Sequence, residues 1–209
     1  MRRAGVAGGA LLLAVTSAAG AQTVRIGIHG VGISHVEVRQ ERRAEGGGIG
    51  GYLSVRVGRF GLDLSGHAAS IELVDVPAEP FDVLQGDARL SYAVARSLAI
   101  EVGAGRRKID PEFTAQDVSV VRAGLLSEVR LSSIGSVWGR GAYLVSSRFN
   151  GGGEAGLALE LGLGAALGTA NGRFRVRVEY EFQRIDREVE TVKVPIQVTI
   201  AKLGLDLGF

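Results

Sequence analysis

The chain has 209 residues, which is enough for one domain of ordinary size. It contains no cysteine, and this excludes disulfides, a lipid anchor on cysteine and a cysteine-ligated metal. Its 32 glycines disfavour an all-helical fold, because each interior glycine costs a helix about 1 kcal/mol relative to alanine.

The first segment has the organisation of a secretory signal peptide. Arg2 and Arg3 give it a positive start, residues 10–15 are apolar, and Ala19-Gly20-Ala21 supplies small residues for cleavage. The apolar run is too short for a membrane-spanning helix, which needs about 20 residues. We therefore expect residues 1–21 to be a signal peptide and residues 22–209 to be the mature domain.

Removal of that segment changes the charge of the protein. The whole chain has 24 Lys+Arg and 22 Asp+Glu, and the first 21 residues hold two arginines and no acid. The mature domain is therefore neutral and lacks the positive surplus that nucleic-acid binding needs. No nucleic-acid partner is expected.

From residue 22 onward, apolar and polar residues alternate with a period of two, which is typical of β-strands. The clearest case is residues 173–183, where Phe174, Val176, Val178 and two further apolar side chains lie on one face. Asn171-Gly172, a strong hairpin signal, joins this run to the preceding one. In chain order, the pattern predicts strands near 24–38, 49–57, 62–68, 84–94, 98–104, 121–131, 137–149, 156–167, 173–183 and 194–209.

Two kinds of connection alternate between these strands. Short turns are expected near 58–61, 95–97, 132–136 and 168–172, and longer polar loops near 39–48, 75–83, 106–117, 149–154 and 185–193. Transmembrane barrels show this asymmetry, with short periplasmic turns and longer outer loops. The chain is thus predicted to be all-β: a closed antiparallel up-and-down barrel of about ten strands with both ends on the periplasmic side. One misread strand would give eight.

Alternation alone does not decide which face is inside, because a soluble barrel buries its apolar face and a membrane barrel exposes it to lipid. The chain end favours the second. Leu203, Leu205 and Leu207 alternate up to a terminal Phe209. Here the sequence resembles the bacterial outer-membrane β-barrel families, such as the small barrels of the OmpA/OmpX kind. Their last strand carries an assembly signal that reads polar, any, Gly, any, any, apolar, any, apolar.

Lys202, Gly204, Leu207 and Phe209 fit that signal. The resemblance implies localisation in the outer membrane and recognition of the last strand by the barrel assembly machinery. Aromatic residues are expected at the two borders of the apolar band, with Tyr143 and Phe149 at the outer end and Tyr92 and Phe209 at the periplasmic end. Charges of both signs are expected to pair inside the lumen: Asp63, Asp87, Arg89, Glu101, Arg122, Glu128, Arg130, Glu160, Arg175, Arg177, Glu179, Glu181 and Lys202.

No motif points to catalysis. The sequence has three histidines; His29 and His67 are expected to face the lumen and His35 to lie toward the first loop. Ser65 and Ser70 lie near His67 in the sequence, but such proximity is common by composition alone. The lipid-A deacylase motif and the paired acids of the omptin proteases are not found, and Gly103–Gly105 lacks the spacing of a phosphate loop. No catalytic, cofactor-binding or metal-binding residue is assigned.

Two glycine runs, 46–48 and 151–153, are expected at the tips of outer loops. Arg42, Arg43, Arg106, Arg107 and Lys108 are expected near outer loops, where they could meet lipopolysaccharide phosphates. A plain solvated loop is the alternative.

The sequence therefore predicts a monomeric, non-catalytic outer-membrane barrel with a structural or surface-interaction role, in contact with outer-membrane lipid and lipopolysaccharide. A narrow porin-like pore, a membrane enzyme that depends on His67 and a soluble periplasmic barrel remain as alternatives.

Overall fold

The structure is a computed structural model that describes residues 22–39, 41–74, 79–110, 116–169, 173–189 and 191–209. The expected signal peptide, residues 1–21, lies outside these residues. Within them, no helix is long and apolar enough to cross a membrane. The strands are β1 (Gln22–Glu37), β2 (Arg42–Val57), β3 (Phe60–Leu73), β4 (Phe81–Ala95), β5 (Leu98–Asp110), β6 (Val118–Arg130), β7 (Gly135–Phe149), β8 (Glu154–Gly168), β9 (Phe174–Val189) and β10 (Val192–Gly208).

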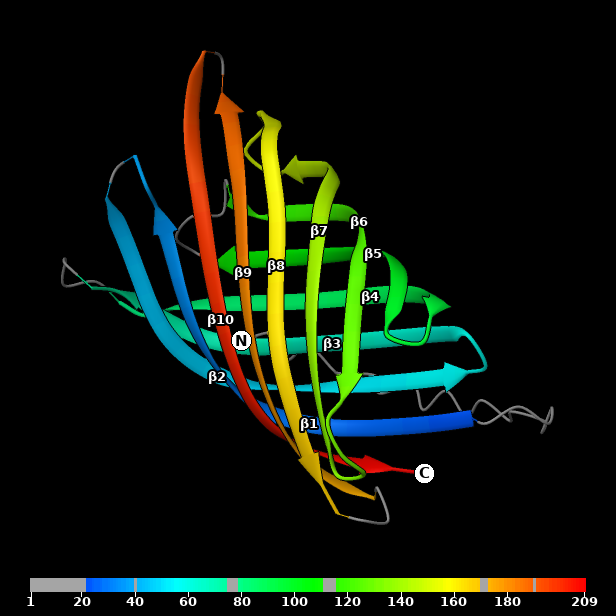
Figure 1. Cartoon of the computed structure of the whole chain (residues 1–209). Helices are drawn as coiled ribbons and strands as arrows, with labels where there is room; N and C mark the ends of the chain where they lie inside the picture. The colour runs from blue at the N-terminus through cyan, green and yellow to red at the C-terminus, as the bar shows by residue number, and fades with distance from the viewer. Residues whose placement is uncertain (1–21, 40, 75–78, 111–115, 170–172, 190) are drawn as a thin grey trace, which may run out of the picture.

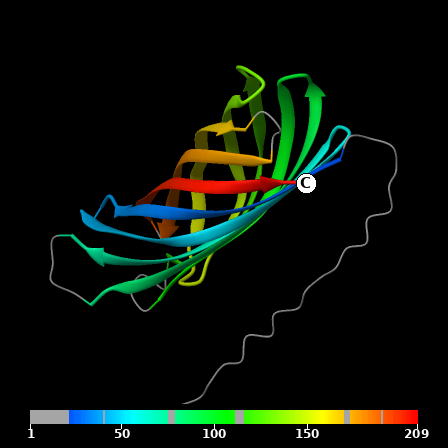
Figure 2. The same ribbon diagram turned by 90° about the horizontal axis from the view of Figure 1, so that it is seen from below.

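The ten strands form one closed antiparallel barrel in which each strand pairs with its neighbours in sequence and β1 pairs with β10. The first and last strands meet along a register that runs from Arg25 opposite Gly208 to Glu37 opposite Ile196. Figure 1 shows β8–β10 crossing in front of β3–β5 at a steep angle, which is the result of strand tilt on opposite walls. Figure 2 shows β10 beside β1, where the barrel closes. Closure leaves neither terminal strand with an unpaired edge.

The prediction of ten strands is confirmed, and the alternative of eight is wrong. The tight connections at 58–59 and 96–97 match two of the expected short turns. The outer connections are shorter than predicted: β9 ends at Val189 and β10 begins at Val192, and the glycine run 46–48 lies inside β2. Longer connections are found between β3 and β4 and between β5 and β6, and the glycine run 151–153 lies between β7 and β8 as predicted. Elsewhere the strands continue into segments whose polarity suggested loops.

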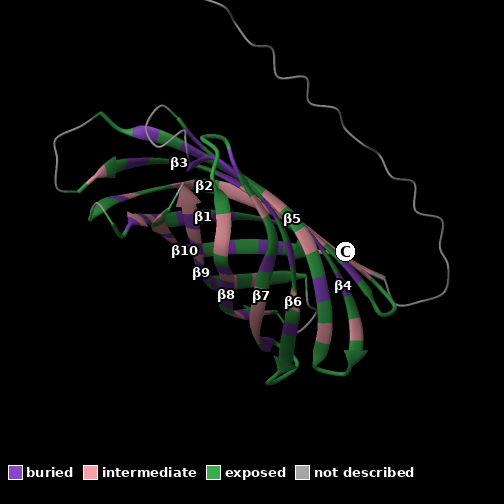
Figure 3. Ribbon diagram, turned by 90° about the horizontal axis from the view of Figure 1, so that it is seen from above, coloured by how far each residue is buried: buried purple, intermediate pink, exposed green. Residues whose placement is uncertain are grey.

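A belt of apolar side chains covers the outer wall of the barrel. Ile28, Val102, Leu163 and Leu203 are each about half or more exposed, as are many of their outward neighbours. Along each strand exposed residues alternate with buried ones, which Figure 3 shows as bands of colour along the ribbons. The prediction that every second residue of this part of the barrel faces outward, toward lipid, is confirmed.

Toward the outer end of the barrel, opposite the chain termini, the outward face becomes polar and the inward face becomes apolar. On β9 the outward side chains change from Val178 and Tyr180 to Arg184 and Asp186, while the inward ones change from glutamates to Ile185. The same change occurs on other strands and builds an apolar core inside the outer part of the barrel, made of Val31, Ile33, Ala44, Ala69, Ile71, Phe81, Val83, Ile109, Val118, Val120, Leu144, Phe149, Ala158, Ile185, Ile196, Val198 and Ile200.

This exchange explains the error in loop length. A strand segment with a polar outer face and an apolar inner face belongs to a barrel surrounded by water. The barrel therefore has two parts with one continuous wall: a lipid-facing part next to the chain termini, and an outer part built like a soluble β-barrel.

The candidate functional site in the barrel interior

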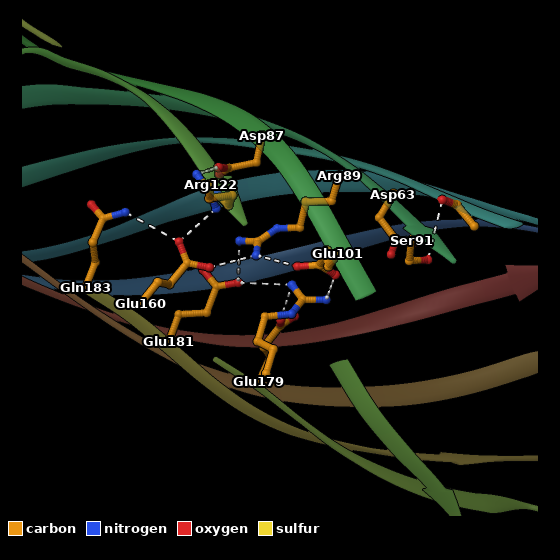
Figure 4. A network of polar contacts seen from close by, with 12 residues as sticks. Asp63, Asp87, Arg89, Ser91, Glu101, Arg122, Glu160, Glu179, Glu181 and Gln183 are labelled. Atoms are coloured by element: carbon orange, nitrogen blue, oxygen red, sulfur yellow. Dashed lines mark hydrogen bonds and ion pairs between the residues drawn. The ribbon is translucent and has the colours of Figure 1, made fainter. Parts of the chain in front are cut away.

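Inside the lipid-facing part, charged side chains from opposite walls meet in a network (Figure 4). Glu160 on β8 lies at its centre and accepts contacts from Arg89 on β4 at 2.7 Å and from Arg122 on β6 at 2.8 Å. Arg89 also contacts Glu101 at 3.1 Å, and Arg122 contacts Asp87 at 2.5 Å. Each of these five side chains is 5% exposed or less. Ion pairing therefore replaces hydration as the interaction that stabilises their charges.

A second group of charges extends the network across the lumen. Lys202 on β10 lies 3.0 Å from Glu181 on β9, and Arg140 on β7 lies 3.5 Å from Glu101. Arg140 also lies 3.8 Å from Glu179, which Arg177 contacts at 2.9 Å. The network thus reaches side chains of β4–β10. It leaves a cavity of about 40 Å³ whose lining includes His29, Tyr52 and Arg140.

Two inward glycines make room for these long side chains. A Cβ atom on Gly105 would lie 2.3 Å from the Asp87 carboxylate and 2.4 Å from the Arg122 guanidinium. A Cβ atom on Gly162 would lie 2.7 Å from Cγ of Arg140. Glycine at these inward positions therefore leaves the space that the arginine side chains occupy in the lumen.

Arg177 is held between two aromatic rings, a contact that the sequence pattern does not predict. Its guanidinium carbon lies 4.8 Å from the ring centre of Tyr52 and 4.5 Å from that of Trp138. Tyr52 in turn donates a hydrogen bond to Asp206. Period-two alternation places these residues on the inner face, but it does not show that β2, β7 and β9 bring them together.

Two of the three histidines lie together in the lumen, and the third lies at the outer end of the barrel. His29 and His67 face the lumen as predicted, with ring centres 6.5 Å apart in an edge contact. Nε2 of each ring has no hydrogen-bond partner among the described side chains. Ser70 is exposed on the opposite face of β3 from His67, whereas Ser65 lies on the same inner face as His67. The described residues contain no group of three or more His, Asp or Glu that could hold a metal ion.

His35 lies toward the first connection as predicted, two residues before the end of β1, and it is buried inside the outer end of the barrel. Its Nε2 atom lies 2.8 Å from Oε1 of Gln116, whose amide donates to Glu37 at 2.5 Å. Gln116 precedes β6, and its buried side chain therefore joins this end of the β5–β6 connection to β1. Arg107 is also buried here and donates to Gln183 at 2.9 Å. Arg107 lies near the outer end of β5 as predicted, but because it is buried inside the barrel the expectation that it could meet lipopolysaccharide phosphates is wrong.

Most of the predicted lumen charges lie on the inner wall. Glu128 and Arg130 also lie on inward positions of β6, but they are exposed at the periplasmic mouth. Phe149 is not part of an aromatic border: it is 8% exposed and packs in the apolar core, beneath the Arg187 guanidinium. Phe174, Tyr180, Tyr92 and Tyr143 are exposed on the outer wall as predicted.

No protein-family model matches the chain, and no curated protein matches it in sequence. Among solved structures, the barrel is similar to the outer-membrane protease OmpT of Escherichia coli, with a TM-score of 0.56 and 10% identity over 90% of this chain and 96% of that one. Neisserial surface protein A gives a TM-score of 0.46 with 10% identity over 89% of this chain and 97% of that one. The attachment invasion locus protein Ail of Yersinia pestis gives 0.37 with 13% identity over 90% and 98%.

The likeness to OmpT shows the fold. The exposed aliphatic belt supplies the physical reason for a membrane location, since only helices and closed barrels satisfy their backbone within lipid. The chain is therefore an integral outer-membrane β-barrel protein.

Proposed function

We propose that this protein is a non-catalytic, non-conducting outer-membrane barrel that presents its outer part as a rigid surface-interaction platform. Two observations carry the proposal, and from them we infer a double closure of the lumen. The charged network crosses the lipid-facing part, and the apolar core lies inside the outer part. An ion that enters the lumen would have to pass the apolar side chains of the outer part, which offer no ligands in exchange for its water.

A structural role is also supported by the chemistry of the closed lumen. His67, the histidine considered for catalysis, lies within this packed interior. We include in the proposal a monomeric barrel surrounded by outer-membrane lipid and lipopolysaccharide. We also include recognition of β10 by the assembly machinery during insertion.

Planar bilayer recordings test the proposal. The purified barrel, with correct folding verified by its heat-modifiable gel mobility, is expected to give no steady current over a range of salt concentrations. A trimeric porin reconstituted in the same way serves as the positive control. A steady current that rises with salt would contradict the double closure and would favour the narrow-pore alternative.

A further inference from the structure

Three cations on the outer wall of β5–β7 lack the carboxylate partners that other outward cations have. Arg106 and Lys108 on β5 and Arg148 on β7 are exposed, and no ion pair joins any of them to a described residue. By contrast, Arg43 pairs with Glu45, Arg184 with Asp186 at 2.9 Å, and Lys193 with Glu188 at 3.1 Å. The outer wall is thus neutralised on β2, β9 and β10 and left positive on β5–β7.

The register places two of these cations in one row. Arg106 lies opposite Ser119 on β6, and Ser119 lies opposite Arg148 on β7. Neighbouring strands are about 4.8 Å apart, so the two arginine backbones are separated by roughly 10 Å with a serine between them. Both side chains can therefore reach one anionic group placed over Ser119.

The row lies at the upper edge of the aliphatic belt. On β5 the next outward residues toward the chain termini are Ala104 and Val102, and on β6 the next is Val121. Val102 and Val121 are each 48% exposed. An amphiphile with its anionic group on the row would thus have its acyl chains directly against the belt.

The neighbouring wall leaves room for a bulky headgroup. Pairing between β7 and β8 ends at Tyr143 opposite Leu159, although both strands continue toward the outer end. Between them lies a groove of about 500 Å³ whose lining includes Ser146 and Arg148 of β7 and Glu154 and Gly156 of β8.

We propose that Arg106, Ser119 and Arg148 form a binding site for the phosphate of an outer-leaflet glycolipid, with Lys108 adding positive charge and the acyl chains lying on the belt below. Guanidinium groups bind phosphate through charge-assisted, often bidentate hydrogen bonds, which favours arginine for this task. Asp82 and Asp110 face each other in register beyond Lys108, so the positive field is strongest at the arginine row. This inference rests on the proposed contact with lipopolysaccharide and names the residues that make it.

Native mass spectrometry of the folded barrel with bisphosphorylated lipid A tests the site. The double variant Arg106→Gln/Arg148→Gln is expected to retain lipid A at least about tenfold more weakly than the unchanged protein, since two charge-assisted contacts are lost. Arg184→Gln, which removes an outward arginine already paired with Asp186, is the matched control and should change retention less than about twofold.

Chemically changed probes identify the source of the phosphate. Dephosphorylated lipid A is expected to bind the unchanged protein as weakly as bisphosphorylated lipid A binds the double variant. Equal retention of lipid A by the double variant and by Arg184→Gln would overturn the site. Equal binding of phosphatidylglycerol, or displacement of lipid A by millimolar inorganic phosphate, would overturn the assignment to a glycolipid. The bilayer current is independent of these residues, so a conducting barrel would contradict the proposed function while leaving the lipid site intact.

Discussion

Replacement of Glu160 by alanine is expected to destabilise the folded barrel by about 3 kcal/mol. The substitution removes the carboxylate that joins Arg89 at 2.7 Å and Arg122 at 2.8 Å. Both guanidinium groups then remain buried with less compensation, which is more harmful than loss of the pair as a whole. The cost should lie at the low end of the range for buried ion pairs, about 3 to 5 kcal/mol, because Arg89 keeps Glu101 and Arg122 keeps Asp87.

The measurement is a denaturant titration of the barrel in phospholipid vesicles, followed by heat-modifiable gel mobility. Glu188→Ala is the matched control, because its pair with Lys193 is well exposed, with 37% and 70% of the two side chains accessible. Its loss should cost less than about 1 kcal/mol. Equal stability of the two variants would mean that the network is hydrated and contributes little to closing the lumen.

Replacement of Val178 by arginine is expected to destabilise the inserted barrel by about 2 to 4 kcal/mol, the range for arginine at the bilayer midplane. Val178 lies on the outer face of β9 between Phe174 and Tyr180, and it is paired in register with Leu203 and Ala165. It is 51% exposed, so the cost would come from lipid contact and not from overpacking.

The same titration checks this result. Ser70→Arg is the control, since Ser70 is exposed on the outer face of β3 beside Asp82, within the part of the wall whose outer face is polar. Arginine there should change the free energy of unfolding by less than about 1 kcal/mol. Equal tolerance at Val178 and Ser70 would show that the aliphatic belt does not face lipid.

Much of the lipid-facing part could be predicted because its alternation is strict. Residues 173–183 show one face of apolar side chains and one of charges, and both faces are found where the pattern put them. The turn at 58–59 follows from a short polar break between two such runs. The C-terminal pattern from Lys202 to Phe209 indicated that the apolar face is the outer one, since this pattern favours a membrane barrel over a soluble one.

The outer part could not be assigned in the same way. Asp186 and Glu188 fall in the segment 185–193 that polarity predicts to be a loop, yet they lie on the outer face of β9 while Ile185 packs inside. Arg107 and Phe149 were misplaced for the same reason: the alternation continues, but the face in contact with water has changed. A period of two reports that two faces exist and does not report which one is inside.

By itself, the sequence determined the number of strands, the tight turns and the two faces of the lipid-facing part, because these depend on neighbouring residues along one backbone. Only the tertiary structure decided which charges pair across the lumen, where the barrel changes from a lipid-facing wall to a water-facing one, and where Gln116 lies. These features depend on strand register and closure, which bring together residues such as Arg89 and Glu160 from opposite walls.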